Sequence, residues 1–358
     1  MGIPGRVVKG QKTYWHLMAS QRKPTEYDIA TSRLLYHPQR GFEVNVPAAD
    51  WYRRYQKESV FTCSDWEQFA DPRQTTYTSY TALQNQKEIF VGRLLHSTLQ
   101  GGHDLKLDPG WPSSLESTLS AVLYPLHGLQ MLAAYVGQMA PASRITIAAM
   151  FQAADEVRRI QRFAYRLRQL QHAMPDLERV DGRRTWERGE HWQPLRSLIE
   201  HLLVTYDWGE ALLALNFVLK PALDELLLVD YAQQAYRCAD HPMQLMCHSL
   251  NEDCQWHLRW SRALVASALR DTPAQREALV AIVERWLPLA TKAVTAIAEK
   301  VGAKPRPTEG VVHENWQLML SELDAGAGAE PVVAELDSRR TAQAPAPLRK
   351  TERRRRAR

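Results

Sequence analysis

Apolar residues recur at helical spacing in six long segments, at about residues 75–99, 113–138, 143–173, 194–230, 243–270 and 273–300. Strand patterns are almost absent from the chain. Helices of about 25–35 residues joined by short turns are typical of a bundle, and no repeat indicates a solenoid. The pattern therefore predicts an all-α fold built as a long-helix bundle.

Two of the segments carry one continuous apolar stripe, which we expect to face the core. The stripe of residues 143–173 consists of Ala153, Val157, Ile160, Ala164, Leu167 and Leu170. The stripe of residues 243–270 consists of Met246, Leu250, Cys254, His257, Ser261, Leu264 and Ala268. The segment 194–230 is apolar on more than one side, which predicts a helix surrounded by others and kinked at Pro221.

The first 75 residues show no periodicity and combine prolines with dispersed aromatic residues. This composition predicts an extended arm that lies either on a partner or around its own domain. We divide the chain into the arm (1–75), a helical bundle (76–301) and a C-terminal extension (302–358), which composition predicts to be disordered and basic from about residue 325. The candidate partner-contact residues are Trp15, Tyr27, Trp51, Tyr52, Tyr55 and Trp66.

The net charge of +5 resides at one end of the chain. Residues 339–358 carry nine Lys or Arg against one Glu, so the rest of the chain is mildly acidic. This tail lacks the interleaved aromatic residues that stack on bases, which disfavours nucleic-acid binding. A helical adaptor that touches nucleic acid through the tail remains an alternative.

The composition, with 358 residues, 45% of them hydrophobic and 24% charged, is that of a globular protein. The four cysteines form no C-x-x-C pair, and the first twenty residues lack a signal-peptide core. The longest apolar stretch, from Leu198 to Val229, is interrupted by Glu200, Asp207, Glu210, Lys220 and Asp224. We therefore expect a cytoplasmic protein with no membrane span.

A long-helix bundle raises the question of a di-iron site, which needs a Glu-x-x-His pair on each of two helices. None of the twelve histidines has an acidic residue three positions before it. Two half-motifs remain. Glu156 is followed by Arg159 where the imidazole would stand, and His257 is preceded by Cys254 where the carboxylate would stand. Because arginine cannot deprotonate to bind iron, this pattern predicts a bundle without metal.

Simpler interpretations of these residues exist. Glu156 and Arg159 could form an ion pair on a solvated helix face, and His257 could be a hydrogen-bonded core histidine. A zinc site is an alternative, using Cys238, His241, Cys247, His248, Cys254 and His257. A stand-alone metalloprotein using His257 with Glu210, Asp224 and Glu225 is another. No phosphate-binding loop or serine-hydrolase elbow is present in the sequence.

Several segments resemble one protein family, in the same order along residues 12–301. They are Arg22-Lys23-Pro24-Thr25-Glu26-Tyr27-Asp28, Asp71-Pro72-Arg73-Gln74, Gln138-Met139-Ala140-Pro141-Ala142-Ser143, Ala154-Asp155-Glu156, Asp207-Trp208-Gly209-Glu210-Ala211 and His257-Leu258-Arg259-Trp260-Ser261. The chain resembles the beta subunit of the hydroxylase component of bacterial multicomponent di-iron monooxygenases. The toluene monooxygenase branch is the most similar.

The resemblance implies a ferritin-like bundle, similar to the small subunit of ribonucleotide reductase. It also implies a homologous alpha subunit that holds the di-iron centre and a small gamma subunit, assembled as a dimer of heterotrimers. An effector protein, a ferredoxin and an NADH reductase would serve the complex, which would hydroxylate or epoxidise a small aromatic hydrocarbon or alkene with O2. In such a beta subunit we expect no catalytic residue, no cofactor and no metal.

Overall fold

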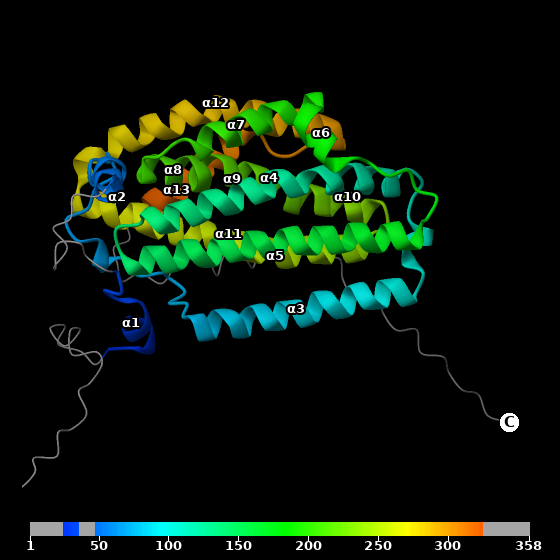
Figure 1. Ribbon diagram of the computed structural model, residues 1–358, viewed down its shortest axis with the longest axis horizontal. Helices are drawn as coiled ribbons and strands as arrows, with labels where there is room; N and C mark the ends of the chain where they lie inside the picture. The colour runs from blue at the N-terminus through cyan, green and yellow to red at the C-terminus, as the bar shows by residue number, and fades with distance from the viewer. Residues whose placement is uncertain (1–23, 36–46, 325–358) are drawn as a thin grey trace, which may run out of the picture.

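A computed structural model describes residues 24–35 and 47–324, and in these ranges every regular element is helical (Figure 1). The five long helices are α3 (Tyr77–Gln100), α4 (Trp111–Met139), α5 (Ser143–Ala173), α11 (His241–Asp271) and α12 (Arg276–Val301). Short helices are α1 (Glu26–Thr31), α2 (Pro47–Tyr52), α6 (Gly182–Arg188), α7 (Gln193–Leu203), α8 (Trp208–Leu213), α9 (Lys220–Asp224), α10 (Tyr231–Arg237) and α13 (Thr308–Asp324). The predicted all-α class and its long helices are confirmed.

The predicted helix 194–230 is wrong in one respect, because the chain leaves the helix after Leu203 and re-enters it at Trp208. Asp207 caps the new start by accepting a hydrogen bond from the backbone N–H of Glu210. The helix then runs to Arg237 through two π-helical stretches, η7 (Ala214–Leu219) and η8 (Glu225–Asp230), on either side of α9. The sequence predicted a kink at Pro221, and the structure has a π-helical stretch on each side of the short helix that contains this residue.

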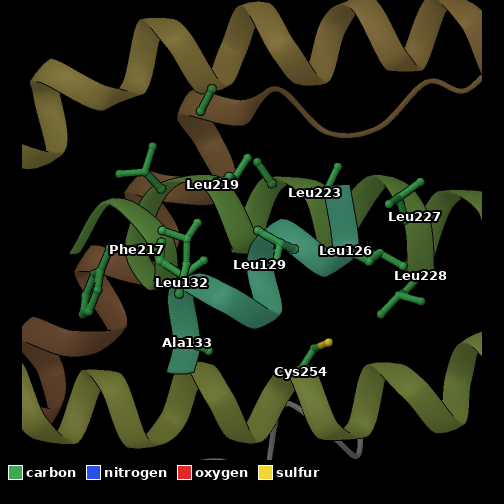
Figure 2. Close-up of a cluster of buried hydrophobic side chains, with 14 of the residues drawn as sticks. Leu126, Leu129, Leu132, Ala133, Phe217, Leu219, Leu223, Leu227, Leu228 and Cys254 are labelled. Carbon is green, nitrogen blue, oxygen red and sulfur yellow. The ribbon is translucent and has the colours of Figure 1, made fainter. Parts of the chain in front are cut away.

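The segment from α8 to η8 forms the central layer of the core. Figure 2 shows Leu219, Leu223 and Leu227 along one side of this segment, with leucines of α4 next to it and Cys254 projecting from α11. Leu219, Leu223 and Cys254 are each at most 3% exposed. As predicted from its apolar residues, this segment is surrounded by other helices.

The prediction that two apolar stripes face the core is confirmed for one helix and partly wrong for the other. All seven residues of the α11 stripe are buried, which confirms that prediction. The α5 stripe is wrong at Val157, which is 39% exposed, while Ile160, Ala164 and Leu167 are half-buried. The buried face of α5 instead includes a set of polar residues, which are Gln152, Asp155, Glu156, Arg158, Arg159, Arg166 and Gln169.

The described part of the N-terminal arm packs on the start of α5. Thr25 and Asp28 form a capping box at the start of α1. Arg144 of α5 donates a hydrogen bond of 2.7 Å to Asp28 and lies over the ring of Tyr27. The hydroxyl of Tyr27 accepts a hydrogen bond of 2.9 Å from the backbone N–H of Asp71. The Arg22–Asp28 segment thus includes residues that anchor the arm to the bundle.

Within the C-terminal extension, α13 packs against α11 and α12. Arg262 of α11 pairs with Glu322 at 3.1 Å and donates to Asn315 at 3.2 Å. The basic tail, residues 339–358, lies outside the described residues.

One described helix, α4, is long and apolar enough to cross a membrane by length and composition alone, and 61% of its apolar window is buried inside the protein. Its only charged residue, Glu116, is itself buried. The sequence interpretation named residues 198–229 as the longest apolar stretch and did not consider α4 as a possible span.

Two helical glycines give opposite expectations for replacement by alanine. A Cβ at Gly209 would lie 2.8 Å from Oγ of Ser59 and closer still to Cβ of Phe61, whereas a Cβ at Gly92 would meet nothing within 4 Å. We expect Gly209→Ala to lower the free energy of unfolding by about 1–3 kcal/mol. Gly92→Ala should raise it by up to about 1 kcal/mol, since alanine is the better helix former. Urea unfolding of both variants measures this, and equal effects would contradict the predicted close packing.

Candidate functional site

The two half-motifs meet in the centre of the bundle. Glu156 and Arg159 project from α5, and Cys254 and His257 project from α11. A third element, α9, adds Lys220 and Asp224 between them. All six side chains are buried, with His257 and Arg159 only 1% exposed. We call these six residues the core charge cluster.

The ammonium group of Lys220 is the centre of this cluster. Its Nζ lies 2.5 Å from Oε1 of Glu156 and 2.8 Å from Oδ2 of Asp224. It also donates to Sγ of Cys254 at 3.2 Å. One cation therefore contacts three groups of the kinds that bind metals, from three different helices.

Arg159 supplies a second positive charge. Its Nη1 donates to Oδ1 of Asp224 at 2.6 Å and lies 3.7 Å from Oε2 of Glu156. The i, i+3 pair expected from the sequence is thus present, but the shorter contact goes to another helix. Two cations and two carboxyl groups balance one another in a dry interior, which is the condition for burying such charges.

The protein environment fixes the protonation of these groups. Burial would lower the pKa of Lys220, but Asp224, Cys254 and Glu156 outweigh burial and raise it. Burial would raise the pKa of Asp224, but Lys220 and Arg159 outweigh it and lower this pKa. Burial raises the pKa of the Cys254 thiol well above its usual range. The cluster therefore holds a charged lysine, a carboxylate at Asp224 and a neutral thiol.

The imidazole of His257 joins this cluster to a second polar layer. Burial, followed by the nearby charge of Lys220, lowers the pKa of His257 to about 3, so the ring is neutral. Its Nε2 lies 3.0 Å from Oδ2 of Asp155, which also accepts hydrogen bonds from Tyr80 and Gln84 of α3 at 2.7 Å each. Burial, followed by the nearby Asp253, raises the pKa of Asp155 well above its usual range.

On the side of the cluster nearest α3, Asp253 has its own cations. Lys87 of α3 and Arg158 of α5 each approach Asp253 at 2.7 Å. Their charges outweigh burial and lower its pKa. Further along α5, Arg166 is fully buried and forms ion pairs with Asp104 and Asp240 at 2.8 and 3.0 Å. The interior thus contains successive ion pairs along α5.

The core charge cluster does not fit a pair of irons. A di-iron site of this fold uses four carboxylates and two histidines, whereas this cluster offers two carboxyl groups and one histidine. Ligand atoms of Glu156, Cys254 and His257 lie within 4.8 Å of one another. However, Lys220 contacts both Glu156 and Cys254, and Arg159 adds another fixed positive charge. These cations would repel a metal ion at the same place.

The remaining metal-ligand candidates do not join this group. Among the described residues, the group of side chains placed to share one metal ion is Glu156, Cys254 and His257. It does not include Cys238, His241, Cys247 or His248. Glu210 lies beside Arg285 and Trp286, and Glu225 pairs with Arg306. Of the three carboxylates considered with His257, only Asp224 belongs to the cluster.

The aromatic residues predicted to contact a partner differ in how exposed they are. Tyr27 is 5% exposed and buried by its own chain. Trp51 and Tyr55 pack on each other and on Tyr206 at centroid distances of 4.6–5.3 Å, with Trp51 on the surface. Tyr52 and Trp66 are partly buried against the core. Trp15 lies outside the described residues.

The sequence interpretation missed the role of Lys220, which it used only as an interruption of an apolar stretch. One signal was available. Lys220 and Asp224 are four residues apart in a helix that is apolar on more than one side, so a buried ion pair between them could be expected. The convergence of this pair on Glu156 and Cys254 required the three-dimensional arrangement.

Comparison with known proteins agrees with this geometry. A family model described as methane/phenol/alkene hydroxylase matches residues 51–272. The chain is 34% identical over 307 residues to the hydroxylase component subunit beta of the toluene-4-monooxygenase system of Ectopseudomonas mendocina, covering 84% of this chain and 94% of that protein. It is 25% identical to the oxygenase component DmpL of the phenol 2-monooxygenase of Pseudomonas sp. strain CF600, covering 81% and 86%.

Solved structures show the same fold. A chain of toluene 4-monooxygenase (T4moH), solved with toluene bound in the resting active site, matches with a TM-score of 0.77 and 35% identity over 81% of this chain and 97% of that chain. A chain of xenon-pressurized phenol hydroxylase from Pseudomonas sp. OX1 matches in fold with a TM-score of 0.70 and 20% identity, over 90% and 98%. The fold is that of the ferritin-like helical hydroxylase components. The chain belongs to the methane/phenol/alkene hydroxylase family.

Proposed function

We propose that this chain is a non-catalytic structural subunit, equivalent to beta, of a multicomponent di-iron hydroxylase. The observation that carries the proposal is the position of Lys220, whose ammonium contacts Glu156, Asp224 and Cys254 in the bundle core. A side chain that supplies this fixed charge removes the need for a metal at the same place. The chemistry then belongs to a partner subunit.

The relatives support the presence of partner subunits. The relative from Ectopseudomonas mendocina is named as subunit beta of a hydroxylase component, and this chain covers 94% of it. The proposed complex pairs this chain with a metal-bearing alpha subunit and a small gamma subunit, as a dimer of heterotrimers. An effector protein, a ferredoxin and an NADH reductase act on that complex. It inserts one atom of O2 into a small aromatic hydrocarbon or alkene, in the cytoplasm.

The alternatives have less support. A stand-alone metalloprotein based on His257 would need Lys220 and Arg159 to leave the cluster first, at the cost of unpaired buried carboxylates. A nucleic-acid adaptor would act through residues 339–358, which lie outside the described part of the chain. We therefore retain the hydroxylase subunit as the proposal.

The chain purified alone should contain less than one iron per ten chains by inductively coupled plasma mass spectrometry. The co-purified complex should contain iron and oxidise hydrocarbon in the presence of its electron-transfer proteins. Stoichiometric iron in the single chain, lost in His257→Ala, would overturn the proposal in favour of a stand-alone metalloprotein.

Removing the central cation should destabilise the chain without any metal being involved. Lys220→Met leaves Glu156 and Asp224 with Arg159 alone, and we expect it to lower the free energy of unfolding by about 3–5 kcal/mol. The matched control is the double variant Lys220→Met/Glu156→Gln, which also removes one negative charge and should recover part of the loss. Chemical unfolding of the three proteins measures this. No recovery in the double variant would mean that Lys220 acts through packing rather than charge.

The neutral His257 should make stability depend on pH. Its pKa is about 3 in the folded chain and about 6.5 when unfolded. The unfolded state therefore takes up a proton first as the pH falls. The contribution is complete above about pH 6.5 and is lost toward pH 3, with a total of about 3–5 kcal/mol.

His257→Gln is the control for this pH dependence, because it keeps a polar side chain without a titrating ring. Unfolding free energies of both proteins between pH 4 and 7 should show a steeper fall for the wild type. Parallel curves would mean that His257 is not held neutral.

A further inference from the structure

The ammonium nitrogen of Lys220 has the surroundings that a bound metal ion would have. It lies 2.5 Å from Oε1 of Glu156, 2.8 Å from Oδ2 of Asp224 and 3.2 Å from Sγ of Cys254. Zinc binds carboxylate oxygen at about 2.0–2.2 Å and thiolate sulfur at about 2.3 Å. Each contact of the ammonium therefore exceeds a zinc bond by less than about 1 Å. A zinc ion at the same place would need only small movements of these side chains.

His257 adds a nitrogen ligand that is already oriented. Ligand atoms of Glu156, Cys254 and His257 lie within 4.8 Å of one another. Nε2 of His257 lies 3.0 Å from Oδ2 of Asp155, whereas Nδ1 is buried and has no hydrogen-bond partner. Histidines that bind metals characteristically donate the N–H of the other ring nitrogen to a carboxylate or carbonyl. His257 therefore has one nitrogen available for a metal and a carboxylate that fixes its ring.

The charges of the core charge cluster also balance around a divalent ion. Arg159 pairs with Asp224 at 2.6 Å, and Lys220 balances Glu156. A zinc ion in place of the ammonium brings two positive charges, and its binding releases the thiol proton of Cys254 to solvent. The zinc ion, the Glu156 carboxylate and the Cys254 thiolate then sum to zero. The interior thus exchanges one ammonium for one divalent ion without gaining net charge.

The types of ligand favour a single zinc ion. A thiolate, an imidazole and a carboxylate suit one tetrahedral zinc. A pair of irons would need four carboxylates, and the core charge cluster offers two carboxyl groups. The obstacle to zinc is the ammonium of Lys220, whose positive charge lies where the ion would have to lie. The three ligands are therefore present, and one side chain closes the site.

We propose that Glu156, Cys254 and His257 form a site for one zinc ion that Lys220 keeps closed, so that Lys220 excludes metal ions from this chain. The inference uses only contacts inside the chain and holds whichever complex the chain belongs to. On the proposed function, this exclusion keeps metal ions available to the metal-bearing subunit.

The test is metal binding by the full-length chain and its variants, measured by titration calorimetry with zinc and by absorption with cobalt(II). Lys220→Ala should bind about one zinc per chain, at least about 100-fold more tightly than the wild type. With cobalt it should show a thiolate-to-metal charge-transfer band. The matched control Lys220→Ala/Cys254→Ser should lose this band. Lys220→Ala/Asp155→Asn should keep the band and bind zinc about 10–100-fold more weakly than Lys220→Ala.

A second variant covers the case in which Lys220→Ala folds poorly without metal. Lys220→Ala/Asp224→Asn removes one negative charge together with the ammonium, so that Arg159 balances Glu156 and folding does not require zinc. It keeps all three ligands and should show the same charge-transfer band with cobalt. Both variants should gain thermal stability when zinc is added, because zinc binds the folded state.

Three results would overturn the inference. Zinc bound by the wild type at one ion per chain would mean that the ammonium does not close the site. No binding by either Lys220 variant, including after refolding in the presence of zinc, would mean that the three ligands do not form a site. Zinc binding that Cys254→Ser leaves unchanged in the Lys220→Ala background would place the metal elsewhere in the chain.

Discussion

The buried ammonium of Lys220 is the constraint on which the rest of the structure depends. A charged amine in a dry core is stable only with opposite charges at contact distance. Glu156 and Asp224 supply them at 2.5 and 2.8 Å, and Arg159 completes a balanced set. Each partner comes from a specific place on α5 or α9. The register of these helices is therefore set by charge pairing as well as by apolar packing.

This constraint connects the interior of the protein to its surface. The central ion pairs occupy the inward positions of α5, and further pairs along the same helix extend the polar side to Arg166. Met150, Val157 and Tyr165 of α5 are exposed on its outer side, although its other large apolar residues are buried or half-buried. A core arranged around fixed charges and an exposed apolar face are thus two results of the same helix orientation.

Sequence patterns predicted the helices well because a 3.6-residue period in a long segment is a strong local signal. The same reasoning failed for α5, where Val157 continues an apolar stripe that the structure turns toward solvent. Periodicity assumes that apolar residues face the core, and this assumption does not hold where charged residues pair inside. The 17-residue α13 was not predicted, although it packs on two core helices.

The candidate site could be predicted in part. The two half-motifs showed which positions lacked a metal ligand, because that property depends only on residue spacing. The identity of the group between them depended on the contacts of Lys220 with three helices, and no spacing along one helix encodes such a contact. Asp155 is a similar case, because it lies next to Glu156 in the sequence but bonds to α3 and to His257, at the edge of the cluster.

On the proposed function, a core held by permanent charges also explains how a subunit without metal can support a metal-bearing one. A helix bundle organised around a metal gains part of its folding free energy from that metal, so its apo form is less stable. In this chain the positive charges are covalent parts of Lys220 and Arg159 and are present as soon as the chain is made. If the chain holds no metal, as we propose, its fold does not depend on iron supply. On the proposed function, such a subunit offers its partner a surface that is already formed before the partner's metal is loaded.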